Sequence, residues 1–167
     1  KIAIVYADPV RADAAQTLAA LDASGLESRI VSGDRYSPVR ALAGELGIEG
    51  EGEMRPDTKL ALLDTLKADG RRPLMVGDGI NDGPALAAAH ASIAPSTASD
   101  VSQQAADAVF LGKGLMPVAL AVTIARRTMR IVRQNFGFAI GYNVVAVPLA
   151  LAGLVTPLIA AIAMSLS

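Results

Sequence analysis

The sequence of 167 residues contains no cysteine, a single histidine and few aromatic residues, which make up 4% of the chain. Without cysteine, this stretch can form neither disulfides nor thiolate metal sites. The formal net charge is -1, so nothing indicates bulk attraction to nucleic acid or to an acidic partner. The single histidine, His90, lies in an alanine-rich stretch, where a structural role is far more common than a catalytic one.

Charge is also absent from the end of the chain. No charged residue follows Arg133, and hydrophobic residues make up 52% of the whole sequence. The chain therefore consists of a charged part followed by an uncharged tail. It begins at Lys1, and the apolar run over residues 2–6 is too short and wrongly flanked for a signal peptide. We expect this sequence to be a fragment of a longer polypeptide.

Short apolar runs alternate with helical patterns through the charged part. This alternation predicts an α/β fold with a parallel sheet and right-handed crossovers. The polar, glycine-rich stretch over residues 47–56 predicts a surface loop. Strands are expected at residues 2–7, 28–31, 74–76, 92–94 and 107–111, and helices at residues 11–23, 37–46, 56–69, 83–90 and 99–106.

The stretch from Leu74 to Leu86 carries the strongest chemical signal. A short apolar run ends there at a Gly-Asp-Gly turn, so Asp78 is expected at the carboxyl end of a buried strand, where open α/β sheets bind ligands. Asp82 follows in the same stretch, beside the amide of Asn81. Two carboxylates near a phosphate pocket suit Mg²⁺. Taken alone, the Gly-Asp-Gly tripeptide also fits a strand-to-helix turn with an aspartate cap.

The full string from Gly77 to Leu86, Gly-Asp-Gly-Ile-Asn-Asp-Gly-Pro-Ala-Leu, resembles the hinge signature of P-type cation-transporting ATPases, within the haloacid dehalogenase superfamily. Its one departure is Gly83, where that family usually has alanine or serine, and the change is expected to loosen the helix start. The resemblance implies a haloacid dehalogenase-like parallel sheet with flanking helices, followed by a stalk helix and transmembrane helices.

Three shorter elements fit the same resemblance. Asp8-Pro9-Val10-Arg11 resembles the Asp-x-x-Arg element of the phosphorylation domain. Ser32-Gly33-Asp34 resembles the superfamily's second motif, in which threonine or serine binds the phosphoryl group. Lys59 stands where the family places its third-motif lysine, whose ammonium would offset phosphoryl charge. Taken alone, these elements also fit a capped helix, a plain turn and a solvated lysine.

The resemblance implies that ATP phosphorylates an aspartate in an Asp-Lys-Thr-Gly-Thr motif. This sequence lacks that motif, so the chain alone is expected to be inactive. The roles that the resemblance implies for its residues are Mg²⁺ binding by Asp78 and Asp82, support from Asn81, close approach of the cofactor at Gly77 and Gly79, phosphoryl binding by Ser32 with Gly33 and Asp34, and charge neutralisation by Lys59.

A helical pattern that carries four arginines, Arg126, Arg127, Arg130 and Arg133, comes directly before the uncharged tail. A basic helix that binds nucleic acid is the alternative, but the uncharged residues that follow disfavour it. Residues 134–153 would give about 30 Å of helix, enough to cross a bilayer. Arginines before a span favour a cytoplasmic location for that flank.

Polar residues in the tail suggest an ion pathway, because such residues are costly within a membrane. Tyr142 and Asn143, followed by Met164, resemble the copper-exporting class of P-type ATPases, whose Cys-Pro-Cys signature would lie upstream. Thioether and neutral oxygen ligands suit a soft monovalent ion, Cu⁺ or Ag⁺. Packing between helices is the plainer alternative.

We therefore predict a phosphorylation domain over residues 1–112, a stalk helix over 113–133, a transmembrane helix over 134–153 and the start of a second over 157–167. The expected function is ATP-driven Cu⁺ transport across a bacterial inner membrane, with the phosphorylation domain in the cytoplasm. The expected partners are the membrane, the upstream ATP-binding and transmembrane parts of the same polypeptide and a copper chaperone, and not nucleic acid.

The alternatives are a soluble Mg²⁺-dependent phosphatase of the dehalogenase type, with Asp8 as its nucleophile, and a truncated product without enzymatic activity.

Overall fold

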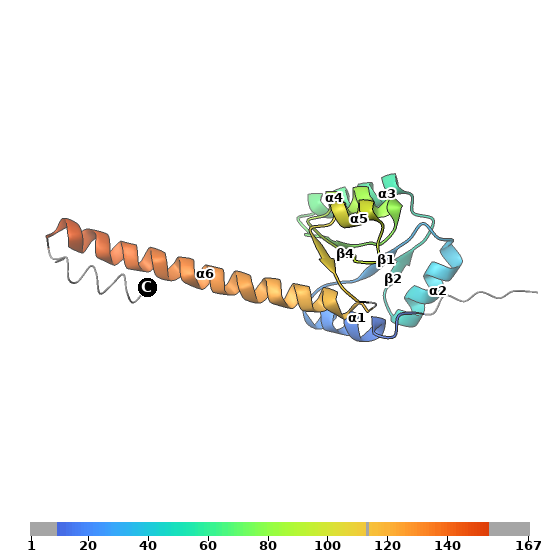
Figure 1. Cartoon of the computed structure of the whole chain (residues 1–167), viewed down its shortest axis with the longest axis horizontal. Helices are drawn as coiled ribbons and strands as arrows, with labels where there is room; N and C mark the ends of the chain where they lie inside the picture. The colour runs from blue at the N-terminus through green and yellow to red at the C-terminus, as the bar shows by residue number, and fades with distance from the viewer. Residues whose placement is uncertain (1–9, 113, 154–167) are drawn as a thin grey trace, which may run out of the picture. The chain divides into compact units, whose positions relative to one another are not determined.

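A computed structural model describes residues 10–112 and 114–153 of the chain. The chain divides into two compact units, residues 1–121 and residues 122–167. Helices and short strands alternate along the first unit (Figure 1). The helices are α1 (Ala14–Ala23), α2 (Tyr36–Leu46), α3 (Pro56–Ala68), the short 3-10 helix η1 (Ile80–Asp82), α4 (Gly83–Ala88), α5 (Asp100–Ala105) and α6 (Met116–Leu151). The strands are β1 (Arg29–Val31), β2 (Glu49–Glu51), β3 (Leu74–Val76), β4 (Ala91–Pro95) and β5 (Ala108–Phe110).

The described strands pair only in parallel. β3, β4 and β5 form one sheet in that order, and β1 pairs with β2. A helix connects each pair of neighbouring strands, because parallel strands need a crossover. The predicted α/β class, with a parallel sheet and flanking helices, is confirmed. The strand predicted at residues 2–7 lies outside the described residues.

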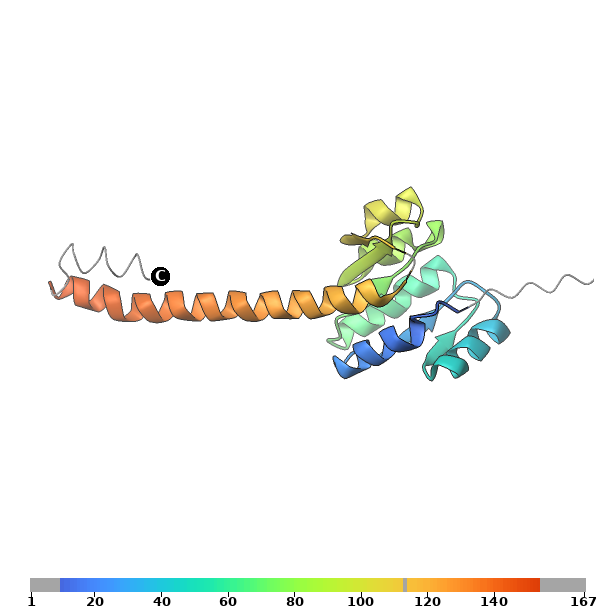
Figure 2. The same cartoon turned by 60° about the horizontal axis from the view of Figure 1, so that its bottom comes forward.

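Apolar side chains cover both faces of the sheet formed by β3, β4 and β5. Leu74 and Met75 are neighbours in β3 but belong to different hydrophobic clusters, because successive side chains of a strand point to opposite faces. On the Met75 face, α3, α4 and α5 lie side by side (Figures 1 and 2). The first cluster contains Leu63, Met75, Ala85 and Leu86, and the second contains Ile93, Phe110 and Val118, with Leu74 packed against it.

The surface loop predicted over residues 47–56 is wrong in part, because it contains β2. The backbone of β2 runs beside β1, with Gly50 opposite Ile30. A Cβ atom at Gly50 would lie 2.5 Å from the Cβ of Ala43 in α2. Close packing between β2 and α2 therefore requires glycine at Gly50.

Asp13, the residue before α1, caps the start of α6 with its side chain. Its Oδ2 accepts hydrogen bonds from the backbone N–H groups of Leu115 at 2.6 Å and Met116 at 2.9 Å. The first N–H groups of a helix have no partners within the helix and carry partial positive charge, so a carboxylate is favourable there. The hydrogen bond from Met116 is the main cause that lowers the pKa of Asp13 below its ordinary value of 3.8.

We expect Asp13→Asn to lower the melting temperature at neutral pH, because a neutral amide is a weaker acceptor at this helix start. The folded pKa lies below the unfolded one, so ionised Asp13 adds stability above about pH 3.8 and loses that contribution as the pH falls through the folded pKa. The difference between wild type and variant should therefore shrink in acid. Thermal unfolding followed by circular dichroism at several pH values measures it.

Asp22→Asn is the matched control, since Asp22 is an exposed carboxylate on α1. It should leave the melting temperature nearly unchanged. A difference for Asp13→Asn that stays constant from neutral to strongly acidic pH would contradict the capping role of the charge.

α6 is one continuous helix of 36 residues, with Pro148 inside it. The helices predicted over residues 113–133 and 134–153 therefore join without a break, and their helical character is confirmed from Met116 to Leu151. The second span predicted over residues 157–167 lies outside the described residues.

Within residues 10–112 and 114–153, the structure contains no helix that is both long and apolar enough to cross a membrane. The transmembrane helix predicted over residues 134–153 is therefore not confirmed. Its polar residues, among them Gln134, Asn135 and Asn143, offset the apolar ones around them.

Candidate active site

Asp78 follows the end of β3 and lines a pocket of about 150 Å³ at the carboxyl edge of the sheet. The last residues of three neighbouring strands contribute to its wall. The side chain of Asp78 is 63% exposed, so its carboxylate is open to a ligand. Carboxyl edges of parallel sheets are the usual ligand sites of this fold class, as the sequence predicted. The lining residues are Arg11, Val76, Gly77, Asp78, Pro95, Phe110 and Leu115.

Arg11 brings a positive charge to the same pocket. Its Nη2 lies 3.7 Å from Oδ2 of Asp78, and its side chain is 36% exposed. An ion pair this long and this solvated contributes little to stability, about 1 kcal/mol at most. Its significance is chemical, because a guanidinium binds phosphate oxygens well and a carboxylate binds a metal cation. The pocket therefore presents both charges that a metal–phosphate group requires.

Lys59 and Asp82 form a buried ion pair next to this pocket. The Lys59 Nζ donates to Oδ1 of Asp82 at 2.6 Å, and the two side chains are 10% and 14% exposed. The other oxygen, Oδ2, accepts from the backbone N–H of Gly79 at 3.2 Å. Both carboxylate oxygens are therefore engaged within the protein. Lys59 therefore contacts the predicted turn by bonding to Asp82. Asn81, also predicted to support the site, lies exposed in η1.

Gly77 and Gly79 leave room for the Asp82 carboxylate. A Cβ at Gly77 would lie 2.9 Å from the Cβ of Asp82, and one at Gly79 would lie 3.2 Å from its Oδ2. A side chain at Gly77 would displace Asp82 and with it the Lys59 contact. The glycines thus serve the close approach of the turn to Asp82, and their predicted contact with a cofactor stays a prediction.

Two serines of the α5 region hold the turn from the other side. Ser102 is fully buried, and its hydroxyl donates to the carbonyl of Gly79. The backbone N–H of Ser99 donates to the carbonyl of Asp78 at 3.3 Å. Ser99 also caps α5, because its Oγ accepts from the N–H of Ser102 at 3.2 Å. Neither residue was predicted from the sequence. A serine directly before a helical stretch is a capping signal that could have indicated Ser99.

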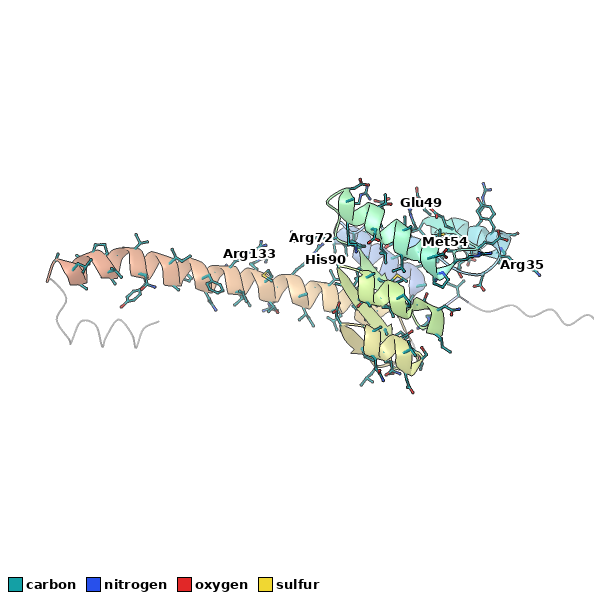
Figure 3. The ribbon with its side chains drawn as sticks, turned by 90° about the horizontal axis from the view of Figure 1, so that it is seen from above. Arg35, Glu49, Met54, Arg72, His90 and Arg133 are labelled. Carbon is teal, nitrogen blue, oxygen red and sulfur yellow. The ribbon has the colours of Figure 1, made fainter. Side chains whose placement is uncertain are left out.

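Ser32, Gly33 and Asp34 form the turn after β1. The Ser32 hydroxyl donates to Oδ2 of Asp34 at 2.9 Å and accepts from the Asp34 N–H at 3.2 Å. The chain after β2 covers this turn, where Met54 donates its N–H to the Ser32 carbonyl at 2.9 Å. Figure 3 labels Met54. The polar side chains of Ser32 and Asp34 bond to each other. The predicted contact of this turn with a phosphoryl group stays a prediction.

Gly83 is the position at which the sequence departs from the family signature. It begins α4 and is buried. A Cβ there would lie 3.1 Å from Cγ1 of Val101 in α5. Glycine therefore lets α4 approach α5 more closely than alanine would.

Tyr142 and Asn143, the predicted ion ligands, lie in α6. The side chain of Asn143 donates to the carbonyl of Ala139, one turn earlier in the same helix, at 2.9 Å. Tyr142 is partly exposed. Met164 lies outside the described residues, so the predicted ion site stays a prediction.

The pocket fits Mg²⁺ because it offers one exposed carboxylate, that of Asp78. Within the described ranges there is no cluster of three or more His, Cys, Asp or Glu side chains that could hold a metal. Mg²⁺ does not need such a cluster, because it often binds through one or two carboxylates and takes its other ligands from water and phosphate. Asp78 supplies one exposed carboxylate, whereas the oxygens of Asp82 are already bonded to Lys59 and Gly79.

The fold and the site agree with a comparison against protein families. Residues 2–90 match the haloacid dehalogenase-like hydrolases. The chain belongs to this family of hydrolases.

Several relatives are named as P-type ATPases, and others are named as nitrogen fixation proteins. The chain is 55% identical to the nitrogen fixation protein FixI of Rhizobium leguminosarum bv. viciae, over 97% of this chain and 21% of the relative. It is 39% identical to the "Probable copper-exporting P-type ATPase V" of Mycobacterium tuberculosis (strain CDC 1551 / Oshkosh), over 98% of this chain and 21% of the relative. The chain thus spans about a fifth of the length of these relatives.

A solved structure shows the same likeness. The crystal structure of a zinc-transporting PIB-type ATPase superposes with a TM-score of 0.82 at 34% identity, over 92% of this chain and 25% of that chain. The predicted resemblance to P-type ATPases is confirmed.

We expect Lys59→Met to lower the free energy of unfolding by about 3 kcal/mol, because it leaves the buried carboxylate of Asp82 without its charge partner. Urea denaturation of the purified chain measures this loss. Lys67→Met is the matched control, since Lys67 pairs with the exposed Asp64 on the surface of α3. The control should cost about 1 kcal/mol or less. Equal losses for both variants would show that the Lys59–Asp82 pair has no special role.

Proposed function

We propose that this chain is part of a P-type ATPase that transports a metal cation, and that its pocket receives the transferred phosphoryl group. The observation that carries the proposal is the exposed Asp78 carboxylate, which faces Arg11 at the carboxyl edge of β3. The Lys59–Asp82 pair holds the same turn from within. The similarity to cation-transporting and copper-exporting P-type ATPases of about five times this length supports a membrane location for the whole polypeptide.

The size of the pocket supports a small ligand. Its volume of about 150 Å³ is below the range of about 300–1,000 Å³ that is typical of sites for small organic molecules. A phosphoryl group with its cation suits this volume, whereas a nucleotide does not. ATP would therefore bind mainly through upstream parts of the same polypeptide, which would also supply the phosphorylated aspartate.

The residues of this chain would have different roles at the pocket. Asp78 would hold the cation, and Arg11 would orient phosphoryl oxygens through its guanidinium. Lys59 would hold Asp82 in place through their ion pair, which fixes the turn that carries Asp78. Mg²⁺, when bound, would neutralise charge on the phosphoryl oxygens. The predicted direct contacts of Lys59 and Ser32 with the phosphoryl group remain part of this proposal.

In the full-length polypeptide, Asp78→Asn should reduce ATP-dependent phosphoenzyme formation by at least about a hundredfold, because it removes the charge that holds the cation at the pocket. Incorporation of labelled phosphate into acid-stable protein measures this. The fold should survive, since the Asp78 side chain is exposed.

Asp69→Asn is the matched control, because Asp69 is an exposed carboxylate at the end of α3. It should leave phosphorylation unchanged. Near-normal phosphoenzyme in the Asp78 variant would refute the cation role. Phosphatase turnover by this chain alone that disappears in Asp8→Asn would favour the soluble phosphatase instead.

For the transported ion, the proposal is a soft monovalent cation, Cu⁺ or Ag⁺. No charged residue follows Arg133, so the tail offers no carboxylate to compensate a divalent ion. Tyr142, Asn143 and Met164 offer neutral oxygen, amide and thioether groups, which suit Cu⁺ together with thiolates from upstream. The mycobacterial relative is named as a probable copper exporter, which supports copper. The protein in the similar solved structure is named as a zinc transporter.

The ATPase activity of the full-length protein should rise with Cu⁺ or Ag⁺ under reducing conditions and respond little to Zn²⁺. Met164→Ala should impair this stimulation, because it removes a soft ligand. Phosphate release at several metal concentrations measures both. Met129→Ala, a methionine in the arginine-bearing part of α6, is the control and should leave the stimulation intact. Strong Zn²⁺ stimulation without a Cu⁺ response would reject the copper proposal and leave the P-type assignment untouched.

A further inference from the structure

Four arginines lie close together on α6, at the point after which the chain carries no charge. They are Arg126, Arg127, Arg130 and Arg133, and all four are exposed. Figure 3 labels Arg133 on this helix. No acidic residue occurs after Asp107, so this part of the sequence carries no carboxylate of its own to offset their charge.

The arginines share one side of the helix. At about 100° per residue they fall within an arc of about 120°. Arg126, Arg130 and Arg133 follow the i, i+4, i+7 spacing that places side chains in one row. Gln134 lies within the same arc. This side of α6 is therefore basic and polar over about two turns.

The opposite side of the same segment is mainly apolar. Its large apolar side chains are 38–66% exposed, and the only polar residues among them are Thr128 and Asn135. Basic residues on one side and apolar residues on the other are the pattern of a helix that binds at a membrane surface. The apolar residues are Ile124, Met129, Ile131, Val132 and Phe136.

We propose that the segment of α6 from residue 124 to residue 136 binds anionic phospholipid head groups at a bilayer surface through these arginines. Guanidinium groups bind phosphate oxygens bidentately, and positive charges near an anionic membrane are attracted to it. An anionic bilayer offers phosphates beside an apolar layer and so matches both sides of the helix. Nucleic acid and an acidic protein surface match the arginines but not the apolar side. This inference does not depend on the transported ion or on phosphorylation.

Flotation of the purified 167-residue chain with vesicles tests the proposal. The chain should bind vesicles of phosphatidylcholine mixed with phosphatidylglycerol more tightly than vesicles of phosphatidylcholine alone. Each arginine near an anionic surface contributes about fivefold, so Arg130→Gln with Arg133→Gln should weaken binding to the anionic vesicles about twenty-fivefold. The preference for anionic vesicles should also fall as salt is added.

Two further variants keep the test specific. Arg130→Lys with Arg133→Lys preserves the charge and should retain most of the binding. Arg35→Gln with Arg72→Gln removes the same charge from exposed arginines of the first unit and should leave binding unchanged. Circular dichroism of every variant confirms that the helix content is preserved.

Three results would overturn the proposal. The first is equal binding to neutral and anionic vesicles, which would show that the apolar residues alone attach the chain. The second is an equal loss of binding in the control pair at Arg35 and Arg72, which would show a response to net charge only. The third is tight binding of duplex DNA by this segment that anionic vesicles do not compete away.

Discussion

The candidate site depends on the buried ion pair between Lys59 and Asp82. A charge removed from water is costly unless a partner of opposite sign compensates it, so neither side chain could occupy its place alone. Asp82 bonds to Lys59 with one oxygen and to the N–H of Gly79 with the other. The pair therefore links α3 to the turn after β3. Because that turn carries Asp78, the position of the exposed carboxylate is determined by a contact that lies beneath it.

Asp78 and Asp82 have different roles because their surroundings differ. Asp78 is mostly exposed beside Arg11, whereas Asp82 is mostly buried beside Lys59. An exposed carboxylate can exchange water for a cation, but a carboxylate whose oxygens are both bonded would first have to break those bonds. Gly77 and Gly79 make the buried arrangement sterically feasible, and Ser102 holds the Gly79 carbonyl from α5. The turn is thus fixed on both sides while Asp78 remains open.

The sequence predicted those features that depend on neighbouring residues. The place of Asp78 at a sheet edge follows from an apolar run that ends in Gly-Asp-Gly, and the parallel sheet follows from the alternation of strands and helices. The bond between Lys59 and Asp82 joins residues 23 positions apart, so local spacing gave no sign of it. The polar, glycine-rich composition of residues 47–56 predicted a loop where β2 lies, although close packing against Ala43 is what requires glycine at Gly50. The role of Ser102 depends on α5 lying against the turn, which only the fold creates.

The segment from Arg11 to Asp13 connects the pocket with the first turn of α6. Arg11 faces Asp78 within the pocket, and Asp13 caps the N–H groups of Leu115 and Met116. Leu115 also lines the pocket, so one residue contacts both features. A single residue separates Arg11 from Asp13, so a shift of the backbone at one of them is passed on to the other. A phosphoryl ligand that shifted the backbone at Arg11 would therefore also act on Asp13, which caps the start of α6.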